Sequence, residues 1–285
     1  MTSYGKTLKQ IRINKGLTQK DVAENIISHS FYAKVERDDS NIAADRLLDI
    51  LDRLNMEGDE FLFIHNGYNE PYKRTLRQDL LQTFFKNDTE KMTQLRAEID
   101  LKFRETDDFF YQLLSIDTYC IIQKLNDEPI DVALIEPLKN YLFDTETWGH
   151  YEAMLFTNNM FIFDIETNLM FANKLLKNLK QYEQYSLHER HILTALINLT
   201  ILCIDNDYTH ETDYYLKLLS TRKKNPKFLY ERNITLFLNG ICLIRDDQVT
   251  EGRAKSERAI QILNTLNMTN NAKRYQKYLD NYLNR

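Results

Sequence analysis

Residues 18–36 of the chain read TQKDVAENIISHSFYAKVE, and this stretch decides the fold of the first part of the molecule. Thr18 and Ser28 are residues that cap helix N-termini, and Asp21 adds an acid to the first turn of the helix that follows Thr18. Gly16 stands where an earlier helix, expected over residues 2–14, would end. The pattern predicts two short helices joined by a tight turn, with the second running from Ser28 to about Val35. Such a helix-turn-helix lays its second helix in the major groove of DNA.

The remainder of the chain is predicted to be helical as well. Only 7 Gly and 4 Pro occur in 285 residues, and strand-like alternation is rare. The expected fold class is therefore all-α, with a five-helix domain over residues 1–66, a linker GYNEP at 67–71, and a TPR-like α-solenoid over 72–285. Helices are predicted in this last part over about 72–87, 89–103, 106–125, 130–142, 147–163, 165–181, 187–204, 207–221, 226–243, 247–265 and 269–284.

Charge is distributed unevenly within the first 66 residues. Residues 1–37 hold seven Lys and Arg against three Asp and Glu, whereas residues 38–66 hold two against eight. One face of the small domain can therefore be basic while another repels phosphate. The whole chain has a net charge of −5, so general attraction to polyanions is not expected.

The predicted helix-turn-helix carries ten candidate DNA-binding residues. We expect basic side chains to contact phosphates at Arg12, Lys15, Lys20, Lys34 and Arg37. Gln19, at the start of a helix, is expected to meet a phosphate too. Base edges are expected to be reached from the start of the second helix by Ser28, His29, Ser30 and Phe31. Glu36 is expected to pair with Arg12 or to cap local structure, and Tyr32 and Val35 to pack inward.

Three asparagines recur at nearly constant spacing in the long helical part. Asn158, Asn198 and Asn239 are separated by 40 and 41 residues, and each stands late in an apolar helix. A repeat near forty residues would bring them onto equivalent helices facing one groove. Because an amide offers both an acceptor and donors, such a column can bind the main chain of an extended peptide. Ordinary amides satisfied inside the solenoid are the alternative interpretation.

Two stretches resemble a known family. LKQIRINKGLTQKDVAENIISHSFYAKVERDDSNI, residues 8–42, resembles the Cro/repressor-type domain at the front of the Rgg family of streptococcal regulators. YLFDTETWGHYEAMLFTNN, residues 141–159, resembles the same family, notably in Trp148-Gly149. The resemblance implies a homodimer that binds double-stranded promoter DNA, and a groove in the helical repeats for a short signalling peptide, as in quorum sensing by peptide pheromones. The usual Arg-Gly after the motif glutamate is Arg37-Asp38 here, so the turn is expected to differ.

A peptide in that groove would be mainly hydrophobic. Its main chain would be held by Asn158, Asn198 and Asn239, and its acidic group, if it has one, by Arg232. Its apolar side chains would be buried by Trp148, Tyr151, Leu155 and Phe237.

Other classes of function find less support in the sequence. Neither a phosphate-binding loop nor a catalytic motif is present, so neither an enzyme nor a cofactor is expected. His188 and His191 lack a third metal ligand, and no metal site is expected. Three cysteines in apolar runs, without a long apolar segment, favour a cytoplasmic protein that does not enter the membrane. Two alternatives remain: a stand-alone repressor whose repeats only dimerise or contact RNA polymerase, and a peptide-sensing phosphatase-type regulator.

Overall fold

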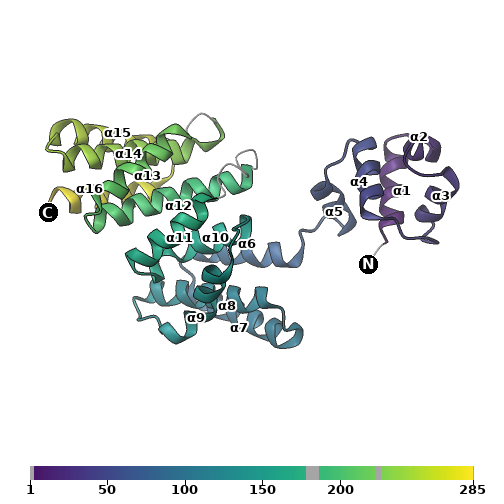
Figure 1. Ribbon diagram of the computed structural model, residues 1–285, viewed down its shortest axis with the longest axis horizontal. Helices are drawn as coiled ribbons and strands as arrows, with labels where there is room; N and C mark the ends of the chain where they lie inside the picture. The colour runs from purple at the N-terminus through teal and green to yellow at the C-terminus, as the bar shows by residue number, and fades with distance from the viewer. Residues whose placement is uncertain (1–2, 178–185, 223–225, 285) are drawn as a thin grey trace. The chain divides into compact units, whose positions relative to one another are not determined.

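The computed structural model describes residues 3–177, 186–222 and 226–284, and all regular structure in these ranges is helical (Figure 1). The chain forms two compact units, Met1–Asp88 and Thr89–Arg285. The helices of the first unit are α1 (Tyr4–Asn14), α2 (Gln19–Ala23), α3 (His29–Glu36), α4 (Ala44–Arg53), α5 (Gly58–His65) and α6 (Tyr72–Phe85).

The second unit is built from longer helices. They are α7 (Thr89–Thr106), α8 (Phe109–Asn126), α9 (Val132–Asp144), α10 (His150–Asn159), α11 (Ile165–Lys177), α12 (Ser186–Asp205), α13 (Thr209–Thr221), α14 (Leu229–Arg245), α15 (Val249–Thr265) and α16 (Thr269–Leu283). Short 3₁₀ turns follow α10 at Met160–Ile162 and precede α14 at Pro226–Phe228. The predicted end of the helix at 178–181 lies outside the described residues.

The predicted capping residues begin and end the helices of the helix-turn-helix. The Thr18 side chain accepts from the Asp21 backbone N–H, and the Asp21 carboxylate accepts from the Thr18 N–H at 2.8 Å, which completes a capping box. Ser28 caps α3 by accepting from the Phe31 N–H at 3.2 Å. Gly16 has a φ of +69°, the left-handed conformation that ends α1. Local sequence therefore fixes the three helix boundaries around the turn.

A small apolar core holds α3 in position. Tyr32 and Val35 point into it, as predicted, and the second face of α3 stays outside. A Cβ at Gly5 of α1 would lie 1.8 Å from the Val35 carbonyl oxygen, so only glycine permits this close approach of α1 to α3. The buried members of the core are Leu8, Ile11, Val22, Ala23, Tyr32, Val35, Ile50, Leu51, Leu54 and Phe61.

The second unit has the two-layered packing of an α-solenoid. Successive even-numbered helices pack on each other in the order α8, α10, α12, α14, α16, and α7, α13 and α15 pair with their neighbours in this layer. Within the described chain, successive odd-numbered helices share no comparable contact. Because the more closely spaced layer of a curved stack lies on the inside, we call the even-numbered helices the inner layer. The predicted TPR-like architecture is confirmed.

The compact units divide after Asp88, so α6 belongs to the first of them. The sequence predicts a linker at 67–71, which places α6, beginning at Tyr72, in the repeat domain. Gly67 and Tyr68, in that segment, do adopt positive φ angles of +67° and +63°. No helix in the described part of the chain is both long enough and apolar enough to cross a membrane.

Candidate functional site

The first turn of α3 presents polar side chains on the surface of the helix-turn-helix. His29, Ser30 and Lys34 are exposed on the face of α3 opposite its core-facing residues. Phe31 is half-buried and packs against the edge of the core. Ser28 is exposed, and its hydroxyl both caps the helix and lies 3.2 Å from the Ser30 hydroxyl. Lys15, Lys20 and Arg37 are exposed around this face. Seven of the ten predicted residues are therefore exposed, and Phe31, Arg12 and Gln19 are half-buried.

Arg12 and Gln19 both bind the Glu36 carboxylate, and the Arg12–Glu36 pair is one of the two arrangements predicted for Glu36. Arg12 Nε and Nη2 donate to the two carboxylate oxygens of Glu36 at 2.6 and 2.9 Å, and Nη1 donates to the Leu17 carbonyl at 2.8 Å. Gln19 Nε2 donates to Glu36 Oε2 at 2.7 Å. The Arg12 side chain is 11% exposed and that of Glu36 is 1% exposed. Arg12 is thus one half of a buried ion pair, which leaves little of its side chain for a phosphate, and Gln19 donates to the same carboxylate.

This ion pair decides the charge state of Glu36. Burial acts to raise the pKa of Glu36, but hydrogen bonds from Arg12 and Gln19 and the charge of Arg12 outweigh it, so the pKa is lowered. Burial also raises the pKa of the Tyr32 phenol, which faces the pair. The cluster ties α1, α2 and α3 together, and it therefore positions the exposed face of α3.

The turn after α3 accommodates an aspartate where the related family has glycine. Asp38 has a φ of +66°, in the left-handed region, which is unfavourable for a residue with a Cβ. Its carboxylate accepts a hydrogen bond from the Ser3 hydroxyl and lies 3.5 Å from Lys6 Nζ. Ser3 is the N-cap of α1. The expected departure from Arg-Gly thus leaves a left-handed turn in place and links it to the start of α1.

The three recurring asparagines occupy three successive helices of the inner layer. Asn158 lies on α10, Asn198 on α12 and Asn239 on α14, and α12 packs against both other helices. Asn158 is exposed, and Asn198 and Asn239 are half-buried. Asn239 Nδ2 donates to the Thr235 carbonyl at 2.6 Å, which leaves its amide oxygen for other partners.

Each of these asparagines belongs to a stripe of partly accessible side chains with helical spacing. The stripe on α12 includes Thr194, Asn198 and Ile201, and the stripe on α14 includes Arg232, Leu236, Asn239 and Leu243. On α10 the corresponding residues are Tyr151, Met154 and Asn158. Arg232 is exposed two turns before Asn239, on the same stripe, as predicted. The inner layer thus offers amides among apolar side chains.

Three predicted lining residues are core residues instead. Trp148, Leu155 and Phe237 are 0%, 3% and 1% exposed, so they cannot touch a ligand at the surface of the inner layer. Trp148 packs against Phe156 and Phe171 with ring centroids 5.4 and 5.6 Å apart, and its Nε1 donates to a backbone carbonyl. These three side chains are large and apolar, and such side chains gain most free energy when they are fully buried.

The Trp-Gly motif therefore positions α10 and does not contact a ligand. Gly149 is the N-cap of α10, and its backbone N–H donates to the Glu152 carboxylate at 2.8 Å. Glu152 also accepts a hydrogen bond from the Tyr141 hydroxyl of α9. With Trp148 buried beside them, these contacts fix the start of the helix that carries Asn158.

Sequence reasoning missed a buried polar cluster next to Asn158. Asp117 of α8 is 7% exposed, and its Oδ1 accepts a hydrogen bond from Asn159 Nδ2 at 2.9 Å. Burial raises the pKa of Asp117 to about 6, although hydrogen bonds from Asn159 and Asn158 oppose the shift. The spacing in the sequence could have indicated this residue, because Asp117 precedes Asn158 by 41 residues and the asparagines are 40 and 41 residues apart.

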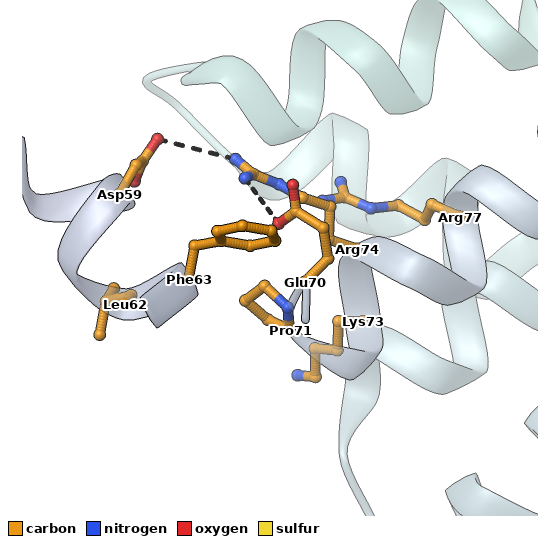
Figure 2. A pocket seen from close by; sticks show the side chains of 8 residues that line it. All are labelled: Asp59, Leu62, Phe63, Glu70, Pro71, Lys73, Arg74 and Arg77. Carbon is orange, nitrogen blue, oxygen red and sulfur yellow. Dashed lines mark hydrogen bonds and ion pairs between the residues drawn. The ribbon is translucent and has the colours of Figure 1, made fainter. Parts of the chain in front are cut away.

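A separate small cavity lies in the first unit, between α5 and α6 (Figure 2). Its volume is about 200 Å³, below the usual range for small-molecule sites. Figure 2 shows Arg74 reaching Asp59 and Glu70, with ion-pair distances of 3.8 and 3.0 Å, while the Phe63 ring lies beside them. Arg74 and Asp59 are well exposed and the Glu70 side chain is 34% exposed, so the pairs contribute little stability. The cavity is not a candidate ligand site.

Two histidines of the described chain lie close together. The ring centroids of His191 and His150 lie 4.8 Å apart, and the side chain of His188 lies outside the described residues. Among the residues that the structure describes, no group of three or more His, Cys, Asp or Glu could hold a metal ion. All three cysteines are buried thiols.

Comparison with solved structures identifies the fold over nearly the whole chain. A candidate transcriptional regulator from Listeria monocytogenes EGD-e has 24% sequence identity and a TM-score of 0.86, over 99% of this chain and 97% of that chain. The SHP pheromone receptor Rgg2 of Streptococcus dysgalactiae has 23% identity and a TM-score of 0.81, over 98% and 99%. A PrgX/iCF10 complex has 18% identity and a TM-score of 0.73, over 99% and 96%. These likenesses concern the fold.

Family comparison covers both parts of the chain. Residues 8–61 match a helix-turn-helix family, in agreement with the capped turn at Thr18 and Ser28. Residues 94–277, more than half of the chain, match the family described as the C-terminal domain of the HTH-type transcriptional regulator Rgg. This is a family of transcriptional regulators and not of enzymes. The chain belongs to the Rgg family of helix-turn-helix transcriptional regulators.

Proposed function

We propose that this regulator acts in the cytoplasm as a homodimer that binds promoter DNA through α3 and responds to a short hydrophobic signalling peptide bound along the inner layer. The observation that carries the proposal is the position of Asn158, Asn198 and Asn239 on the accessible stripes of three adjacent helices. Two proteins of similar fold support the proposal: Rgg2 is a receptor for the SHP pheromone, and PrgX forms a complex with iCF10.

DNA binding is proposed for the exposed side of the helix-turn-helix. Lys15, Lys20, Lys34 and Arg37 would neutralise phosphates, while His29 and Ser30, at the start of α3, would reach base edges. A dimer would present two such helices to half-sites about one helical turn apart. Glu36 does not oppose this binding, because its charge is compensated by Arg12 within the domain.

Peptide binding is proposed for the inner layer of the second unit. Amides at three successive helices can pair with the main chain of an extended peptide at intervals, and need not read its side chains. Half-buried Ile201, Leu236 and Leu243 lie beside these amides, so apolar peptide side chains would lose contact with water there. Arg232 would meet an acidic group. The peptide changes transcription only to the extent that it binds one state of the dimer more tightly than another.

Titration calorimetry with synthetic hydrophobic octapeptides tests the peptide site. Asn198→Ala should weaken binding by about 1–3 kcal/mol, because it leaves a peptide group without its partner. Asn173→Ala is the matched control, since Asn173 is an exposed asparagine on α11, outside the inner layer. DNA affinity should be nearly unchanged in both variants.

Two results would contradict the proposal. Equal peptide affinity of wild type and Asn198→Ala would remove the asparagine row from the site. Absence of saturable binding of any octapeptide would favour the alternative of a repressor whose repeats serve only dimerisation or contact with RNA polymerase.

A further inference from the structure

The row of inner-layer amides continues into a carboxylate on the preceding helix. Asp117 of α8 precedes Asn158 by 41 residues, and the later steps of the row, to Asn198 and Asn239, are 40 and 41 residues. Because α8 packs against α10 in the inner layer, this equal spacing gives Asp117 the repeat position of the asparagines. The structure agrees, since the amides of Asn158 and Asn159 both interact with the Asp117 carboxylate.

Asp117 has no cationic partner in the part of the chain that the structure describes. Its hydrogen bonds come from the neutral amides of Asn159 and Asn158. The nearby cation on α7, Arg96, donates instead to the Ser115 hydroxyl at 3.4 Å and lies over the Tyr119 ring at 4.8 Å. A carboxylate that is 7% exposed and lacks a counter-charge is costly, so its presence requires an explanation.

The oxygens around Asp117 match the donors of an alkylammonium group. Asn159 is fully buried, and its Oδ1 has no hydrogen-bond partner within the described chain. Asn159 holds the Asp117 carboxylate from the buried side, so the acceptors that a ligand can reach are that carboxylate and the amide oxygen of exposed Asn158. An ammonium carries three N–H donors, a positive charge and no acceptor. A carboxylate ligand, in contrast, would be repelled.

We propose that Asp117, positioned by Asn159, binds the alkylammonium group of the peptide together with Asn158, so that this group lies at α8 and the chain runs toward α14. The inference rests on the proposed peptide site. Four packed helices at about 8–10 Å per step span roughly 24–30 Å. Eight extended residues reach about 26 Å. A peptide of this length can therefore extend from Asp117 across all three asparagines. The ammonium is either the amino terminus or a lysine side chain, and the two can be separated by experiment.

An acid at the opposite end of the row provides a matched control. Asp280 of α16 follows Asn239 by 41 residues, so it continues the same register. It is exposed and accepts a hydrogen bond from Gln276 Nε2 at 2.9 Å. A carboxylate in water is well solvated and does not require a counter-charge. Asp280→Asn removes the same charge as Asp117→Asn but should not affect ammonium binding.

Calorimetry at pH 7.5 with octapeptides of Leu, Ile, Val and Phe, each with a free or an acetylated amino terminus, tests the proposal. Wild type and Asp280→Asn should bind the octapeptide with a free amino terminus about 10- to 100-fold more tightly than the acetylated octapeptide. Asp117→Asn should bind both forms equally, with the affinity of wild type for the acetylated form. If the ammonium is a lysine side chain, acetylation of the amino terminus does not change the affinity of wild type for an octapeptide with one lysine. Replacing that lysine by methionine then weakens binding by the same factor.

The pH profile supplies a second readout that a purely structural role of Asp117 would not give. The ratio of the affinities for the free and the acetylated octapeptide should fall toward one as pH falls through about 6. Burial raises the pKa of Asp117 to this value, so the carboxylate loses its charge there. Cys120 does not interfere, because burial and Asp117 raise the pKa of its thiol. If wild type binds free and blocked octapeptides equally and the replacement of lysine by methionine also has no effect, this inference alone is overturned. No binding of either form overturns the proposed function with it.

Discussion

Glu36 and Asp117 are both carboxylates that the fold removes from water, but their surroundings differ in one respect. Glu36, in the helix-turn-helix, meets a bidentate guanidinium and an amide, and its pKa is lowered despite burial. Asp117, in the helical repeats, meets only amides among the residues that the structure describes, and burial raises its pKa to about 6. The first acid is satisfied within its own unit. The second is held at the end of a row of accessible amides without a counter-charge, which is the condition expected of a binding group.

The comparison indicates how each unit uses its charge. In the helix-turn-helix, the ion pair fixes α3 relative to α1 and α2, and the exposed residues remain for DNA. In the repeats, the caps, the buried Trp148 and the core fix α10, and the polar groups of the inner layer keep unused hydrogen-bonding capacity. Buried charge has a structural role in one unit and, on our proposal, a binding role in the other.

The largest effect is expected from breaking the satisfied pair. Arg12→Ala leaves Glu36 buried without its counter-ion and should lower the free energy of unfolding by about 3–5 kcal/mol. Urea denaturation at pH 7.5 measures this change. A variant with Arg12→Met and Glu36→Leu removes both charges and should recover most of the loss. A loss below about 1 kcal/mol in Arg12→Ala would mean that the pair is not the structural link we describe.

A smaller effect of opposite sign is expected from the unsatisfied acid. The folded-state pKa of Asp117 is about 6, above the value near 4 of an unfolded chain, so its contribution to stability is present at low pH and is lost as pH rises through about 6. Asp117→Asn should therefore raise the free energy of unfolding at pH 7.5 by about 2–3 kcal/mol. It should also flatten the change between pH 4 and 6. Unfolding curves over this range, with Asp280→Asn as the control, measure both. Destabilisation by Asp117→Asn at pH 7.5 would argue that the charge is structural.

The smallest effect concerns the phosphate contacts that the ion pair leaves available. Lys34→Ala should weaken binding to any duplex and reduce the slope of log affinity against log salt by about one. Fluorescence anisotropy with DNA from upstream of its own gene and with an unrelated duplex measures this slope. Arg12→Ala, corrected for its folded fraction, should leave the slope unchanged. A selective loss at one sequence in Lys34→Ala would assign Lys34 to base recognition.

Local signals in the sequence were sufficient for the helices and the turn. Thr18, Ser28 and Gly16 act through hydrogen bonds and dihedral angles within a few residues, so their positions alone predicted the boundaries. Low Gly and Pro content and helix spacing likewise predicted the two-layered solenoid. The boundary between units was not predicted, because it depends on which contacts α6 makes after folding.

The candidate sites were predicted less completely, because accessibility depends on tertiary packing. Trp148 was expected to line a groove, yet nothing local distinguishes an aromatic that faces a ligand from one that fills the core. The pairing of Arg12 with Glu36 was predicted, but Arg12 was also expected at a phosphate, because the sequence does not show how deeply that pair is buried. Asp117 occupies the repeat position with a carboxylate where the other helices carry an amide, so a repeat of asparagines does not predict it.

The central claim is that Asn158, Asn198 and Asn239 together hold one peptide. The most direct test is a titration of protein labelled with ¹⁵N at asparagine, followed by NMR of the side-chain amides and using an octapeptide that binds in calorimetry. Asn→Gln variants assign the three resonances. The account predicts that all three shift with one dissociation constant, while Asn25 and Asn41 of the helix-turn-helix, both exposed, do not shift with them. A saturable titration that moves none of the three, or only one, would contradict it.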